Sequence, residues 1–283
     1  MFAVVDTKDP TAVAVAVQVI YLEMCPRGSR FFVPRVFGWA MECFTGNYKD
    51  YQAVDTQYHD FEHTLQATLC MIRILHGRWR AQAEPPLSQH LFELGLLAIL
   101  LHDTGYLKKR SDSAGTGAKY TLTHVARSAE FAEGLLAGKR FKRADIHAVQ
   151  HMIRCTGVAV DLTAIPFEDP LERLVGNALG TGDYLGQMSA PDYVEKLPIL
   201  YREFVEAAAH SGGIMPGGGF TSAQDLIRKT PAFWEKYVLP KLTNDFGALY
   251  RFLEDPYPGG PNQYIEAIQA NIARIRREFP AAA

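Results

Sequence analysis

The sequence predicts an all-α fold that forms a single domain. Helical periodicity of apolar residues dominates the 283-residue chain, and strand-like alternation between turn residues is almost absent. A hydrophobic content of 48% is sufficient for an ordinary core, and no long linker or internal repeat divides the chain. We therefore expect one domain over residues 1–283, with an N-terminal helical part at 1–57 and a motif-bearing core at 58–275.

The same periodicity predicts a series of helices in order along the chain. They are expected near 10–24, 31–44, 60–79, 88–104, 123–137, 142–154, 170–187, 191–210, 221–237, 238–254 and 261–278. Segments rich in Gly, Pro and Ser, which favour turns, separate many of them. These segments lie at 25–29, 84–86, 111–117, 211–219 and 255–260.

Charge and composition limit the class of partner. The chain has 29 basic and 31 acidic residues, a formal net charge of −2, so no overall basic field favours a nucleic-acid polymer or an anionic membrane. A small-molecule partner is expected instead. The N-terminus lacks a basic leader before an apolar stretch, and no apolar run reaches the roughly 18–20 residues of a membrane span. These features predict a cytoplasmic protein.

The four cysteines predict no disulfide or cysteine-type zinc site. Cys25, Cys43, Cys70 and Cys155 are scattered and form no C-x-x-C pair. A chain of this length does not need disulfides to hold its fold. We expect all four to be reduced residues of the core.

The stretch "LLAILLHDTGY" at 96–106 is the first indication of a functional site. An apolar run suited to a buried helix ends in His102 and Asp103, and a buried carboxylate is costly unless a cation or hydrogen bonds compensate its charge. A metal ion would provide that compensation. The alternative is a helix that reaches the surface at its C-terminus and stops at Gly105.

Other histidines and carboxylates favour the metal. In "YHDFEH", His59 and His63 are four residues apart, which on a helix of about 100° per residue places both on one face. In "NALGTGDYLGQM", Asp183 interrupts an apolar helical pattern. Further histidines lie on predicted helices at His124, His147 and His151. Each of these alone is more often an ordinary helix residue than a ligand.

Together these residues predict a metal site inside a helical bundle. His63, His102, Asp103 and Asp183 would hold one ion, and Asp103 could bridge to a second ion roughly 3.5–4 Å away. The mixture of nitrogen and oxygen ligands does not choose among Zn, Mn, Fe, Mg and Ni. The expected cofactors are therefore divalent metal ions, two of them bound at one site.

These motifs resemble the HD superfamily of metal-dependent phosphohydrolases, and most closely its cyclic-nucleotide phosphodiesterase branch. "YHDFEH" is similar to that branch's Y-H-N-x-x-H motif, and "LLAILLHDTGY" to its apolar helix ending in H-D. "MIRCTG", "TGDYLGQM", "LYREF" and "PAFWEKYVLPKLTNDFGALYRFL" are similar to later segments of the same branch. The resemblance runs from about Tyr58 to about Ile275.

The resemblance implies a hydrolase that cleaves a phosphoester, a phosphodiester or nucleotide in particular. His63, His102, Asp103 and Asp183 would bind the tighter metal, and His59 would be the general acid that protonates the leaving oxygen. Imidazole titrates near neutral pH, so a histidine held by a carboxylate can donate a proton at modest cost. The partner implied is a small-molecule phosphoester substrate.

The sequence departs from the cyclic-nucleotide enzymes at three positions. Asp60 replaces their Asn, and Tyr106 replaces a further His after the H-D pair. Thr230, followed by Pro231, stands where those enzymes have a Gln that grips a purine base. Other HD proteins hold two ions with the pattern H, H-D, H, H, D.

By that pattern, His124 and His151 would supply the ligands missing from the second metal site, with His147 competing on the same helix face as His151. Lys108 and Lys109 follow the H-D pair and could contact a substrate phosphate. The alternative for these two lysines is solvated surface charge.

Two other functions fit the same residues. HD-type di-iron oxygenases, such as those similar to myo-inositol oxygenase, use the same six-ligand pattern. A non-catalytic helical binding module would keep the metal for stability alone. His59 distinguishes this last alternative from the two enzymes, because a purely structural metal site does not need His59.

Overall fold

The computed structural model describes residues 2–157 and 160–280 and confirms the all-α fold class. Its α-helices are α1 (Pro10–Met24), α2 (Phe32–Phe44), α3 (Phe61–Arg80), α4 (Gln89–Leu101), α5 (His124–Gly138), α6 (Arg143–Ile153), α7 (Pro170–Met188), α8 (Tyr193–His210), α9 (Ala223–Phe233) and α10 (Gln263–Glu278). Within the described residues the only β-type pairings are two isolated bridges, Thr45 with Ala53 and Tyr51 with Lys109. No described helix is long and apolar enough to cross a membrane.

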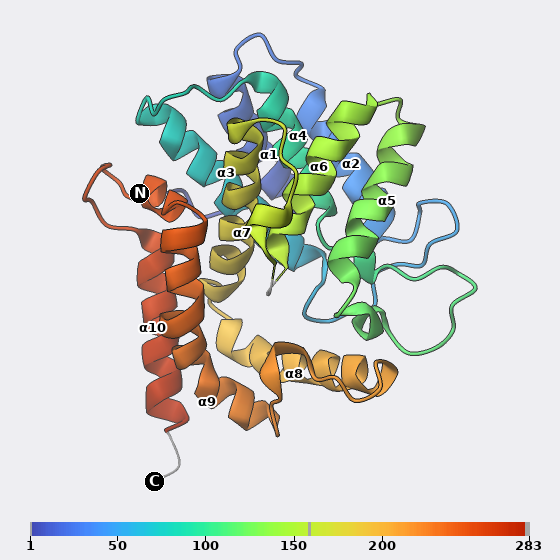
Figure 1. Ribbon diagram of the computed structural model, residues 1–283. Helices are drawn as coiled ribbons and strands as arrows, with labels where there is room; N and C mark the ends of the chain where they lie inside the picture. Colours follow the sequence, from blue (N-terminus) through green and yellow to red (C-terminus); the bar gives the residue numbers. More distant parts are fainter. Residues whose placement is uncertain (1, 158–159, 281–283) are drawn as a thin grey trace.

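Helices α3 and α7 pack against each other at the centre of the fold (Figure 1). Helices α9 and α10 flank this pair on one side, α5 and α6 lie on the other, and α8 crosses one end (Figure 1). Helix α4 packs against α3, α6 and α7, and each residue from Leu94 to Leu101 is buried. The H-D pair therefore follows directly from the hydrophobic core.

Two close backbone approaches bring distant segments to the H-D pair. A Cβ atom at Gly186 in α7 would lie 2.7 Å from the carbonyl carbon of Gln66 in α3, so only glycine permits this contact. A Cβ at Gly105 would lie 2.0 Å from the backbone oxygen of His124. The first approach holds Asp183 beside α3, and the second holds the start of α5 against the turn after the H-D pair.

The C-terminal region differs from the prediction of two regular helices at 221–237 and 238–254. Helix α9 ends at Phe233 and is followed by two π-helical turns, η6 (Trp234–Val238) and η7 (Lys241–Asp245), and a 3-10 turn, η8 (Leu249–Leu253). Pro240 has no backbone N–H to donate to a regular helix. Ala248 has a φ of 54°, which ends the helical path.

The four cysteines are free and buried, as the sequence predicts. They lie in the hydrophobic core rather than near the histidine cluster. Burial raises the pKa of the Cys43 thiol to about 12 and that of Cys155 to about 12, so these thiols stay protonated.

Candidate metal centre

His59 and His63 lie at the start of α3, but only His63 belongs to the helix. Asp60 has an extended backbone and caps α3, because its carboxylate accepts a hydrogen bond of 2.8 Å from the backbone N–H of His63. The expectation that His59 and His63 share a helix face was therefore wrong: α3 begins at Phe61. Their rings still meet edge to face, with centroids 5.6 Å apart.

The H-D pair forms the turn that ends α4. The helix stops at Leu101, three residues earlier than the sequence predicts, and His102 is its C-cap. His102 Nδ1 donates to the backbone oxygen of Ile99 at 2.7 Å, which leaves Nε2 to face the neighbouring carboxylates. Both side chains are buried, His102 completely, so the helix does not simply reach the surface here.

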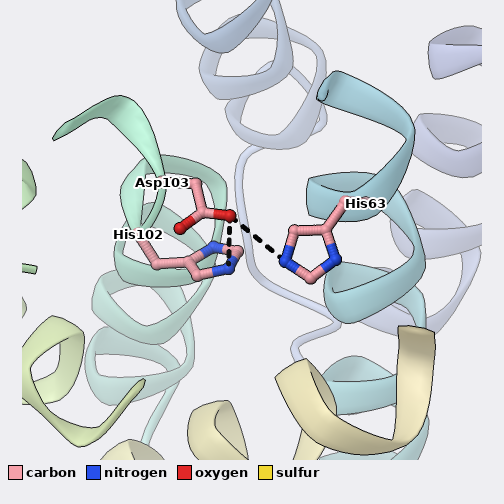
Figure 2. A group of neighbouring side chains, drawn as sticks. All are labelled: His63, His102 and Asp103. Carbon is pink, nitrogen blue, oxygen red and sulfur yellow. Dashed lines mark ion pairs between the residues drawn. The ribbon is translucent and has the colours of Figure 1, made fainter. Parts of the chain in front are cut away.

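His63, His102, Asp103 and Asp183 converge as the sequence predicts. His63 Nε2 lies 3.1 Å from Asp103 Oδ2 and 3.2 Å from Asp183 Oδ1. His102 Nε2 lies 3.5 Å from Asp103 Oδ2 and 3.7 Å from Asp183 Oδ1. Figure 2 shows the Asp103 carboxylate, at the end of α4, between the His102 and His63 rings, with His63 coming from α3.

A second layer of hydrogen bonds orients Asp183. Gln187, one turn later in α7, donates from Nε2 to Asp183 Oδ1 at 3.2 Å. Its Oε1 accepts a hydrogen bond of 2.7 Å from the Tyr58 hydroxyl. Gln187 thus connects the carboxylate to the segment that carries His59, and such outer contacts fix the direction of a metal ligand.

This donor set fits a divalent metal. Ligand atoms of His63, His102 and Asp103 all lie within 4.8 Å of one another. His102 Nε2 and Asp103 Oδ2 are buried and have no hydrogen-bond partner among the described residues. Buried polar atoms without partners are costly, and an ion coordinated by both would satisfy them. These residues therefore fit a metal site better than they fit a group of ordinary core residues.

The protonation of the metal-free cluster follows from its charges. Burial disfavours the charged form of His63, yet the carboxylates of Asp103 and Asp183 raise its pKa to about 10. Burial would raise the pKa of Asp103, but His102 and His63 hold it well below its usual range. Without metal, the cluster is a set of paired imidazolium and carboxylate groups.

We expect the affinity of the protein for Zn²⁺ to rise by at least about tenfold per pH unit between about pH 6 and 9. His63 is protonated in this range, because its pKa is raised to about 10, and it must release the proton to bind metal. Competition with a chelator at several pH values, corrected for protonation of the chelator, measures this slope. An affinity that does not change with pH would mean that His63 is already neutral before metal binds.

His124 lies beside this cluster, as predicted for the second metal. Its Nε2 is 3.8 Å from Asp103 Oδ1, and its Nδ1 bonds to the backbone oxygen of Thr121 at 2.6 Å. Burial lowers the pKa of His124, which favours the neutral, ligating form. Tyr106 stacks with both His124 and His59, with ring centroids 4.7 Å and 4.5 Å away. The two histidine rings are themselves 6.2 Å apart, so the three rings form one group.

Glu203 is the site residue that the sequence-based prediction omitted. Its Oε2 is 2.6 Å from His59 Nδ1, and its Oε1 accepts hydrogen bonds from the backbone N–H groups of Gln57 and Tyr58. Despite burial, His59 lowers the pKa of Glu203, so the carboxylate is ionised. The signal was present in "LYREF", where a carboxylate interrupts the apolar stripe of α8.

His151 and His147 are not brought into the cluster by any ion pair or ring contact among the described residues. His151 Nδ1 lies 2.8 Å from Glu172 Oε1, and its ring packs against Phe167. Its competitor, His147, lies next to the His151 ring. Neither histidine lines the cavity over the metal cluster, and the role of His151 as a metal ligand stays a prediction.

The prediction that Lys108 and Lys109 contact a substrate phosphate was wrong, because neither residue lines the cavity over the metal cluster. Lys108 is buried and bonds to Asp55 Oδ2 at 2.8 Å and to the backbone oxygen of Gly115 at 2.5 Å. Lys109 is half exposed, pairs with Asp50 and lies over the ring of Tyr51. Both lysines therefore connect neighbouring loops. Of the two, Lys109 alone agrees with the alternative interpretation, a solvated surface charge.

A cavity of about 1070 Å³ opens over the cluster. Its lining residues include His59, His63, Asp103, His124 and Asp183 at one end. Apolar and aromatic side chains from α8, α9 and the segments around them form most of the remaining wall. A concave, largely apolar cavity with a few convergent charged groups is the usual form of a small-molecule site.

Sequence comparisons were made with protein families and with curated proteins. A family model described as Npun_R2479-like matches residues 110–278, more than half of the chain. The matched span contains His124, Asp183 and Glu203 and begins after the H-D pair. The comparison with curated proteins finds no match.

Proposed function

The chain belongs to the Npun_R2479-like family, and from the site that it carries we propose that it is a metal-dependent phosphohydrolase acting on a small-molecule phosphoester, a phosphodiester or nucleotide in particular. The observation that carries the proposal is that His59, held by Glu203, lines the same cavity as His63, Asp103 and Asp183. A site that kept metal only for stability would not need an oriented acid–base group beside it.

The ligand residues would hold the metal ions whose positive charge phosphoester cleavage requires. His63, His102, Asp103 and Asp183 would hold one divalent ion, and Asp103 and His124 would contribute to a second. When bound, such ions neutralise charge on the phosphoryl oxygens and lower the pKa of water so that hydroxide is available at neutral pH.

His59 would supply the proton for the leaving group. Glu203 binds Nδ1 at 2.6 Å, so the other ring nitrogen, Nε2, remains to donate to the leaving oxygen. The ionised Glu203 carboxylate holds the ring in this orientation. As the water oxygen bonds to phosphorus and the ester P–O bond breaks, the proton of His59 neutralises the departing alkoxide.

The test is metal content followed by assay. Protein purified without added metal should contain two divalent ions per chain, and it should hydrolyse at least one member of a panel of aryl phosphodiesters, cyclic nucleotides and nucleotides. Two irons of mixed valence, no hydrolysis and dioxygen uptake with a polyol or phosphonate would replace the proposal with the oxygenase. Bound metal with neither activity would leave a metal-stabilised binding module.

A further inference from the structure

The wall of the cavity beyond the metal cluster is formed mainly by aliphatic side chains and aromatic rings. Phe233 and Tyr237 stack with centroids 5.2 Å apart, and Tyr184 packs beside both of them. Phe204 and Phe220 form a second stack with centroids 6.1 Å apart. The cavity, about 1070 Å³, is at the upper end of the roughly 300–1,000 Å³ of small-molecule sites, so it exceeds the needs of a phosphate group.

The threonine and amide side chains in this wall are already engaged. The threonines of the lining each donate their hydroxyl proton to a backbone carbonyl of their own helix or turn: Thr121 to Ala118, Thr123 to Tyr120, Thr156 to Ile153 and Thr230 to Leu226. Gln187 is the one side-chain amide among the described lining residues, and it is held by Tyr58 and Asp183. The buried hydroxyls of Tyr106, at the metal end, and Tyr184 are without a hydrogen-bond partner among the described residues.

The charged side chains far from the cluster lie at the rim. Lys229 is more than half exposed and pairs with Asp225 Oδ2 at 2.8 Å. Arg154 and Asp161 are exposed as well. The cavity therefore has charge at its metal end and at its mouth, with an apolar surface between them.

We infer that the organic group of the substrate is predominantly hydrocarbon, an inference that rests on the proposed phosphohydrolase function. A nucleobase presents several donors and acceptors, and those that the few tyrosine hydroxyls of this wall do not reach would be buried without a partner, at a considerable cost. A hydrocarbon group gains from the same burial. The Tyr184 hydroxyl could serve a single acceptor, such as an ether oxygen.

The test uses 4-nitrophenyl methyl, butyl and octyl phosphodiesters, which share one leaving group, with the metal-loaded protein below the micelle concentration. We expect kcat/KM to rise by up to about fourfold per methylene, so that the octyl ester exceeds the methyl ester by about 10²-fold or more. The affinities of methyl-, butyl- and octylphosphonate, measured by calorimetry, should follow the same order. 3′,5′-Cyclic AMP should be hydrolysed less efficiently than the octyl ester.

A matched pair of variants locates the effect. Phe233→Ala shortens the aromatic wall and should reduce the dependence on chain length, whereas Phe31→Ala, at a side chain 73% exposed and outside the cavity lining, should not. Turnover that is independent of chain length, or a preference for cyclic AMP, would overturn the inference and leave the hydrolase proposal standing. Length-dependent phosphonate binding without turnover would support the apolar site and overturn only the hydrolase proposal.

Discussion

His59→Ala is expected to retain bound metal while lowering kcat by about 10²–10⁴. His63, His102 and Asp103 supply the clustered ligand atoms, whereas the His59 ring is held by Glu203 and faces the cavity. The loss should be largest for substrates with an alkoxide leaving group, because 4-nitrophenolate departs readily without a proton. Metal content by mass spectrometry and kcat on both kinds of ester measure the two effects separately.

His90→Ala is the matched control for this variant. His90 Nε2 pairs with Asp145 Oδ1 at 2.9 Å, which mirrors the pairing of His59 with Glu203, but the His90 side chain is 61% exposed and outside the cavity lining. Its removal should change neither metal content nor kcat. Parallel loss of metal and activity in His59→Ala would identify His59 as a ligand, and an unchanged kcat would exclude it as the general acid.

Asp103→Ala should abolish stable metal binding and, with it, all turnover. Asp103 faces His63 and His102 through Oδ2 and His124 through Oδ1, so no other carboxylate in the cluster replaces it on both sides. Removing it also leaves Asp183 as the one carboxylate of the cluster that faces the buried His63 and His102 rings, at a cost of about 1–3 kcal/mol in the free energy of unfolding of the metal-free protein. Metal analysis after dialysis and denaturant titration measure the two losses.

Glu172→Ala provides the control for Asp103→Ala. It removes another buried carboxylate that pairs with a histidine, His151, and should destabilise the fold by a similar amount. It should keep the metal, because neither Glu172 nor His151 forms an ion pair with a residue of the cluster among the described residues. Metal loss in Glu172→Ala as well would mean that the result reflects general destabilisation, and retention of metal by Asp103→Ala would contradict the assigned ligand set.

Local sequence signals predicted most of the helices and the types of ligand. Apolar periodicity placed α1 to α8 and α10 within a few residues, and it failed between Phe233 and Leu253, where π and 3-10 turns flank Pro240 and the left-handed Ala248. A carboxylate inside an apolar run is unusual wherever the run folds, so Asp103 and Asp183 could be recognised without a structure. Helix spacing was insufficient for His59, because Asp60 caps α3 after it.

The sequence by itself therefore determined an all-α chain with a buried group of histidines and carboxylates. The tertiary structure alone decided which of them meet. His59 pairs with Glu203, which is 144 residues away, while His151 pairs with Glu172 instead of Asp103, and Lys108 turns to Asp55. The spacing of residues along one helix predicts which of them share a face. Which residues contact that face depends on how helices distant in the sequence pack against it.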